Sequence, residues 1–201
     1  DKFKKHLSDL ESLDEKKFKN RNFLYFVIGK YYEKLENEKQ AISYFNKSIR
    51  LNDKFEDAYI NLFALLERTN KIQELEEKLN FYHENNNKIT AKILFYKSLL
   101  FNRKQMYNES EEIIINHNLE YIFKENKNYY VNVLNLRSKN NEKINNYKIA
   151  LSSIKKRNNF LKNLEENKLI KRDSFIETFK NFKKIYTKKN LEKITLSINK
   201  I

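Results

Sequence analysis

The sequence predicts an all-α fold, an α-solenoid of stacked antiparallel helix pairs wound into a right-handed superhelix. Two observations lead to this prediction. Apolar and small side chains recur in the same order about every 34 residues. The chain also contains no proline and a single glycine, whereas sheets and tight turns usually need more of both. Because one helix pair cannot bury its own apolar face, recurring pairs are expected to stack into a continuous core.

Residues 1–21 are predicted to form a helix that leads into the solenoid, and residues 22–55 form the clearest helix pair. Small residues in this pair allow its two helices to approach closely. They are Gly29, Ala41 and Ser48. Aromatic residues at the alternating positions are expected to fill the space between the helices. They are Tyr25, Tyr32, Tyr44 and Phe45.

Three further pairs are predicted over residues 56–89, 91–122 and 128–161. In the second pair Phe63 takes the glycine position and Leu75 the position of Ala41, so looser packing or another packing angle is expected. The third pair keeps the order of small and large residues, with Leu94, Ser98, Phe101, Tyr107, Ser110 and Ile114. The fourth pair is marked by Val131, Leu134, Ile144, Leu151 and Ile154, and has Tyr147 where a small residue is expected. An irregular all-helical domain is the alternative to this repeat assignment.

Asparagine-rich breaks are expected to supply the turns between the helices. Asn tolerates the left-handed conformation and bonds its own backbone. Two such breaks lie at residues 85–87 and at Asn140-Asn141.

The spacing of these pairs resembles the tetratricopeptide repeat. This resemblance implies a protein-interaction scaffold that holds a peptide or a helix in a groove lined by the first helix of each pair. The groove positions are Phe26, Lys30, Ile60, Asn61, Ala64, Lys92, Phe95, Leu99, Asn132 and Leu136. Phe26, Ile60 and Phe95 are expected to face the partner, because packing within the repeats does not require them.

Some tetratricopeptide arrays bind a terminal carboxylate with a clamp of Lys, Asn, Asn, Lys and Arg. Asn61 and Lys92 match two clamp positions, but Phe26, Lys30 and Tyr96 occupy the others. The clamp is therefore incomplete in this chain.

Residues 162–201 are expected to form capping helices or a linker to a further domain. Ser174 and Glu177 form a capping box that opens a helix reaching about residue 188. Residues 147–182, with a basic turn at 155–159, loosely resemble the link between repeats and a sulfotransferase domain in bacterial two-domain proteins. That resemblance implies a region that recruits substrate for an enzyme encoded beyond residue 201.

The charge distribution suggests an alternative function, the binding of nucleic acid or of an acidic partner. The net charge is +14, of which residues 128–201 carry about +12. However, 34 of the 41 basic residues are lysine, which is typical of an AT-rich coding sequence. Dedicated phosphate-binding surfaces more often include arginine. Protein binding is therefore the preferred interpretation.

No catalytic, cofactor or metal site is predicted for these residues. The three histidines, His6, His83 and His117, lack metal-ligand spacing, and one glycine cannot build a phosphate-binding loop. Glu76-Glu77 and Glu111-Glu112 are expected to be exposed helix charges. The absence of cysteine, of a long apolar run and of a leader predicts a cytoplasmic chain without a membrane span. Because the first residue is Asp1 and not methionine, an excised domain or a trimmed chain is expected.

Overall fold

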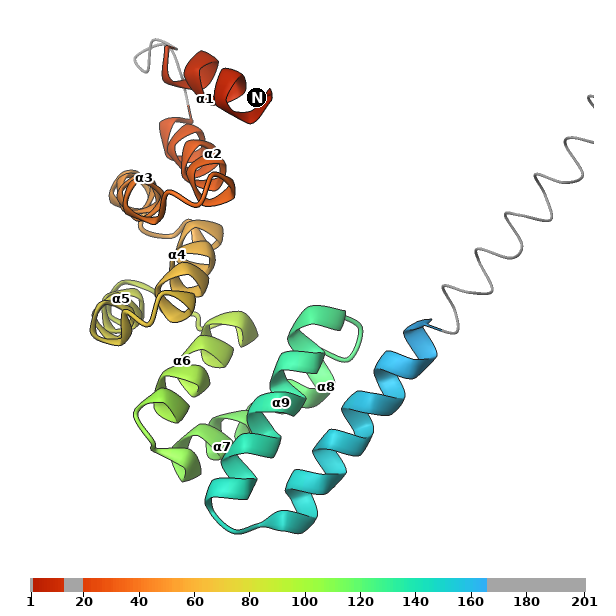
Figure 1. Cartoon of the computed structure of the whole chain (residues 1–201). Helices are drawn as coiled ribbons and strands as arrows, with labels where there is room; N and C mark the ends of the chain where they lie inside the picture. Colours follow the sequence, from red (N-terminus) through yellow and green to blue (C-terminus); the bar gives the residue numbers. More distant parts are fainter. Residues whose placement is uncertain (1, 13–19, 166–201) are drawn as a thin grey trace, which may run out of the picture. The chain divides into compact units, whose positions relative to one another are not determined.

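The computed structural model describes residues 2–12 and 20–165, and every regular element in these two ranges is an α-helix (Figure 1). This confirms the predicted all-α fold. The helices are α1 (Lys2–Glu11), α2 (Arg21–Lys34), α3 (Glu38–Leu51), α4 (Glu56–Arg68), α5 (Ile72–Asn85), α6 (Ala91–Arg103), α7 (Tyr107–Asn116), α8 (Leu119–Ile122) and α9 (Lys127–Lys143). Residues 147–165 are also helical. The chain divides into two units, Asp1–Leu151 and Ser152–Ile201, and α1 to α9 belong to the first.

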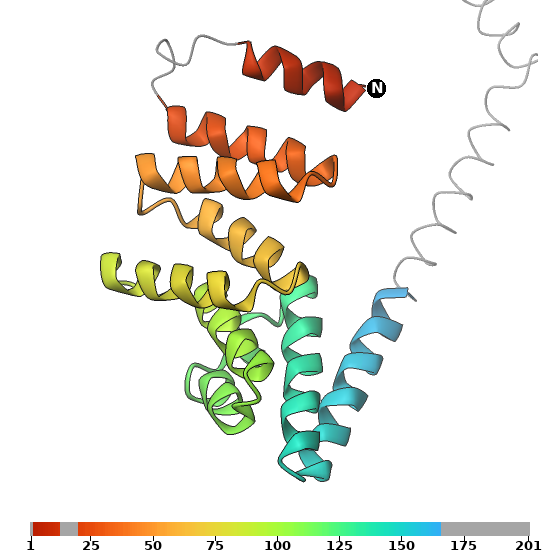
Figure 2. The same ribbon diagram turned by 60° about the vertical axis from the view of Figure 1, so that its left-hand side comes forward.

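Three antiparallel helix pairs follow one another in this unit: α2 with α3, α4 with α5, and α6 with α7 (Figures 1 and 2). Helix α3 also packs on α4, and α5 packs on α6, so a single core runs through all three pairs. Side chains buried in this core include Phe45, Leu62, Leu79, Ile93 and Ile114. Because neighbouring helix pairs share one core, a chain with a mean hydropathy of only −0.85 can still bury enough apolar surface to fold. Its described residues contain helices and no strand.

The close contact predicted in the first pair is present. The side chains of Ala41 and Ser48 have no exposed surface. A Cβ atom placed on Gly29 would lie 2.8 Å from two carbon atoms of the Phe45 ring, so only glycine fits at this crossing. In the second pair Phe63 and Leu75 are themselves fully buried, so the larger side chains are accommodated within the core.

The first helix of each pair ends in the same turn. A residue with positive φ follows the C-cap, and the next N–H donates to the carbonyl five residues back, which is the Schellman motif. The positive-φ residues at these turns are Glu36, Asn70, Gln105 and Asn145, with φ between 56 and 63°. The N···O distances of the closing bonds lie between 2.7 and 2.9 Å at all four turns. The same turn thus ends α9 as well as the first helices of the three pairs.

The turn after α9 lies about one helical turn further along the chain than the predicted register of the fourth pair requires. Helix α9 has 17 residues, whereas α2, α4 and α6 have 13 or 14. Asn140 and Asn141 are therefore buried inside α9, and the turn lies at residues 144–146, so the prediction of a break at Asn140 was wrong. The small position after this turn belongs to the buried Ala150, while Tyr147 is 63% exposed.

The prediction of a basic turn at 155–159 was also wrong, because residues 147–165 are continuously helical. The capping box of Ser174 and Glu177 and the predicted capping helix lie outside the described residues. None of the helices in the described ranges combines the length and the hydropathy required to cross a lipid bilayer.

Candidate binding groove

Half of the predicted groove residues line a single cavity between α4, α6 and α9. These five are Ala64, Phe95, Leu99, Asn132 and Leu136. The cavity has a volume of about 460 Å³, within the range of about 300–1,000 Å³ that is typical of ligand sites. We call it the central cavity. The repeat spacing had placed ten residues of four helices along one groove, and the structure brings these five, from three helices, to one cavity.

The floor of the central cavity is apolar and consists largely of core residues. Phe95 and Leu136 are each only 3% exposed, and the Phe95 ring contacts Tyr129 at a centroid distance of 5.2 Å. The expectation that packing does not require Phe95 was therefore wrong, because it is a core residue whose edge reaches the cavity. Leu99 and Ala64 are half-buried and complete the apolar surface.

Polar side chains from the same three helices form the rim. They are Glu67, Arg68, Asn102, Arg103, Asn132, Asn135 and Lys139. Tyr96 also lines the cavity, and burial, reinforced by the neighbouring Tyr129, raises the pKa of its hydroxyl. The Tyr96 hydroxyl therefore stays neutral, and able to donate a hydrogen bond, to a higher pH than that of an ordinary tyrosine. An apolar floor with a polar rim is the arrangement expected of a peptide-binding surface.

Most of these rim residues were not among the predicted groove positions. The repeat spacing could have predicted two of them, because Arg68 and Arg103 occupy equivalent positions as the last residues of α4 and α6. Helix ends at equivalent places on neighbouring first helices are brought side by side by stacking.

Lys30 and Asn61 lie together at the junction of α2 and α4. The Lys30 Nζ donates to Asn61 Oδ1 at 2.7 Å and to Glu33 Oε2 at 2.7 Å. The Asn61 amide donates to the Asp57 carbonyl at 2.7 Å. The predicted groove residues Lys30 and Asn61 are thus bonded to each other, and they form a polar bridge between the first two repeats.

The remaining predicted groove residues do not line the central cavity. Phe26 is half-buried, and its ring contacts Phe55 at a centroid distance of 5.3 Å. Ile60 is also half-buried and packs against the core. Lys92 is half-buried near the start of α6.

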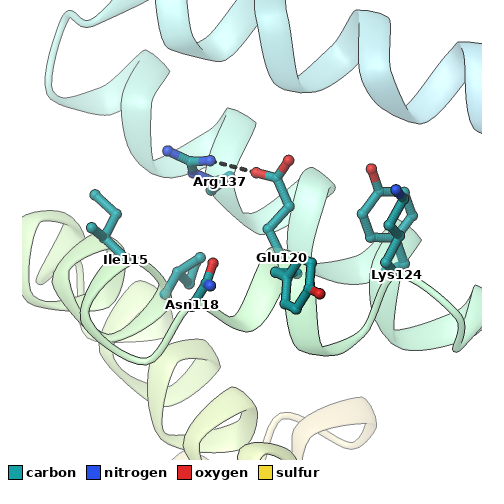
Figure 3. A pocket seen from close by; sticks show the side chains of 8 residues that line it. Ile115, Asn118, Glu120, Lys124 and Arg137 are labelled. Carbon is teal, nitrogen blue, oxygen red and sulfur yellow. Dashed lines mark hydrogen bonds and ion pairs between the residues drawn. The ribbon is translucent and has the colours of Figure 1, made fainter.

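A second cavity of about 440 Å³ lies between the end of α7, α8 and α9 (Figure 3). Its polar centre is Arg137, which bonds Glu120 across the cavity and Glu111 Oε1 at 2.8 Å behind it. The prediction that Glu111 is an exposed helix charge was wrong, since the residue is 5% exposed. No cluster of His, Asp and Glu within residues 2–12 and 20–165 has metal-binding geometry.

Comparison with known proteins shows the fold. No family model and no curated protein matches the sequence. A tetratricopeptide repeat protein from Parabacteroides merdae superposes with a TM-score of 0.59 at 16% identity, over 77% of this chain and 57% of that one. MamA from Desulfovibrio magneticus RS-1 superposes with a TM-score of 0.62 at 14% identity, over 80% and 86% of the two chains. A double mutant of MamA RS-1 gives 0.63 at 14% identity, over 82% and 88%. The chain spans just over half the length of the first of these proteins, and it has the divergent helical-repeat fold of tetratricopeptide proteins.

Proposed function

We propose that this chain is a protein-interaction module that binds a peptide or a helix of a partner protein in the central cavity. The observation that carries the proposal is the convergence of five predicted groove residues on one cavity with an apolar floor and a polar rim. The floor is built from core side chains, so it is preorganised and little conformational entropy is lost when a partner binds. The rim amides supply groups that can bond a peptide backbone. In this proposal the chain acts as a scaffold in the cytoplasm and does not itself catalyse a reaction.

A display library of random 16-residue peptides, selected on the whole chain, tests the proposal. Binding of the selected peptides is then measured by fluorescence anisotropy on two variants. Asn132→Tyr fills the cavity from an exposed position that makes no structural hydrogen bond with the described residues. Asn108→Tyr makes the same change at an exposed position on α7, outside the cavity.

We expect Asn132→Tyr to weaken binding about tenfold or more, which is about 1.4 kcal/mol, and Asn108→Tyr to leave it unchanged. Binding in the cavity should also respond only weakly to salt. If a library yields only binders whose affinity falls steeply with salt and is unaffected by Asn132→Tyr, the basic residues of the C-terminal half are the binding surface instead.

The role of a substrate-recruiting region ahead of a sulfotransferase domain stays a prediction. The residues that carried the resemblance beyond 165 lie outside the described part of the chain. Within the described part, the predicted basic turn that contributed to the resemblance is helical.

A further inference from the structure

Ion pairs connect the first helices of successive repeats in a regular ladder. Arg68 Nη1 lies 3.5 Å from Glu33 Oε1, and Arg103 Nε lies 3.0 Å from Glu67 Oε1. In both pairs the arginine is the last residue of its helix, and the glutamate is the second-last residue of the preceding first helix. We call these pairs the first and second rungs.

The third rung lacks its carboxylate. Asn102 is the second-last residue of α6 and takes the place that Glu33 and Glu67 take in the earlier repeats. Its amide donates to Asn140 Oδ1 at 2.7 Å. Lys143, the last residue of α9, takes the place of Arg68 and Arg103 but does not line the central cavity. The cation that lines the cavity from α9 is Lys139, one helical turn earlier, which is exposed and makes no ion pair with any residue in the described ranges.

The lining of the cavity is positively charged, because it holds the cations Arg68, Arg103 and Lys139 and a single carboxylate, that of Glu67. Two of its cations, Arg68 and Arg103, are each paired with a glutamate, and Lys139 is not. The Asn102 amide carries two N–H bonds, of which Asn140 uses one. Lys139 and Asn102 line the same cavity above the apolar floor, so an anion there would meet an ammonium group and an amide donor together.

We propose that the partner supplies a carboxylate at the third rung: an aspartate or glutamate side chain of the bound peptide or helix lies beside Asn102, where the earlier rungs have a glutamate, and contacts the Asn102 amide and the cavity cation Lys139. Apolar side chains next to that acid would cover Leu99 and Leu136. This proposal rests on the function proposed above and adds a specific chemistry to it. The partner segment is acidic at one position and apolar beside it.

Three variants test the third rung with the library-selected peptides. Lys139→Gln removes the cation, and Asn102→Glu supplies the carboxylate from within the chain. Lys127→Gln is the matched control, because Lys127 is exposed at the start of α9 and does not line the cavity. Each acidic peptide is compared with a version in which its Asp or Glu is replaced by Asn or Gln. Thermal melts of Asn102→Glu check that the variant is folded, and Lys139→Gln changes only an exposed side chain.

On the parent chain and on Lys127→Gln, we expect neutralising the peptide's acid to weaken binding about five- to tenfold. On Lys139→Gln the same change should matter less than about twofold. Asn102→Glu should weaken the acidic peptide about tenfold and leave the neutral version unaffected.

The two proposals fail in different ways. Peptides that lose affinity on Asn132→Tyr but show no preference for the acid contradict the third-rung proposal alone. A library without any binder that depends on the cavity contradicts both. An equal acid effect on Lys139→Gln and on the parent places the carboxylate elsewhere and overturns this inference.

Discussion

At the scale of single residues, the crossing of Gly29 and Phe45 sets the geometry of the first repeat. The Phe45 ring is fully buried, so it cannot move aside without disturbing the core. A methyl group on Gly29 would meet the ring at 2.8 Å. The close approach of α2 and α3 therefore depends on this one glycine.

Gly29→Ala is expected to destabilise the chain. Overpacking costs about 1–3 kcal/mol, and the better helix propensity of alanine recovers at most about 1 kcal/mol. In a Phe45→Leu background the ring is absent, so the same substitution should be neutral or stabilising. Urea denaturation of the four chains in this double-mutant cycle provides the measurement. Equal losses in both backgrounds would show that the contact with Phe45 does not cause the effect.

Residue-scale predictions from the sequence succeeded where a position repeats and failed where burial depends on a neighbouring element. The small positions Ala41 and Ser48 were confirmed, because the repeat spacing specifies which face of the helix they occupy. Glu111 was assigned to solvent because its sequence neighbours are polar. Its burial results from Arg137 on α9, and nothing within α7 signals that partner.

At the scale of elements, a polar network joins the third helix pair to α9. Ser98 Oγ and Ser110 Oγ lie 3.0 Å apart in the crossing of α6 and α7. Asn140 donates to Ser110 Oγ at 2.8 Å and accepts from Asn102. Asn140 is completely buried, so its amide is a specific link between the two elements and not a surface contact.

Asn140→Ala should therefore cost about 1–3 kcal/mol, because it leaves buried hydrogen-bonding groups without a partner. Asn141→Ala is the matched control. Asn141 is equally buried, but its side-chain amide donates only to the Arg137 carbonyl of its own helix. Chemical denaturation should show a clearly larger loss for Asn140→Ala. A larger loss for the control would mean that the network does not hold α9 in place.

The ends of the elements explain why the fourth repeat was shifted in the sequence analysis. The chain closes its turns with Glu36, Asn70, Gln105 and Asn145, none of which is glycine. Glutamate and glutamine are weak turn signals, so the asparagines at 85–87 and at Asn140-Asn141 were read as breaks, whereas the pair Asn145-Asn146 at the actual turn was not. Asn140-Asn141 was consequently taken for a turn, although both residues lie within α9 and their side-chain amides are buried.

At the scale of the whole first unit, different chemistry joins successive repeats. The first two junctions have an Arg–Glu rung, whereas the third has the Asn102–Asn140 bond and the largely buried ion pairs of Arg137 with Glu111 and Glu120. Buried ion pairs are screened by salt much less than exposed ones. Exposed ion pairs contribute about 0–1 kcal/mol and are screened by salt. Hydrogen bonds between neutral amides are not screened by salt.

Raising the salt concentration to about 1 M, where the screening length is about 3 Å, should therefore loosen the first two junctions selectively. Native-state hydrogen exchange should show faster exchange in α4, relative to α9, in high salt than in low salt. In a Glu67→Gln variant the salt effect on the second junction should disappear. Uniform acceleration of all helices would contradict a role for the rungs.

The substitution of Asn102 for glutamate also has a consequence for register. A stack of equivalent repeats presents equivalent sites, so a bound segment could occupy several translationally related positions at nearly equal free energy. Identical rungs would preserve this degeneracy. One rung with a different composition breaks the translational symmetry of the surface and makes a single alignment of the partner the lowest in energy. A single asparagine can thereby make a repetitive surface bind its partner in one defined register.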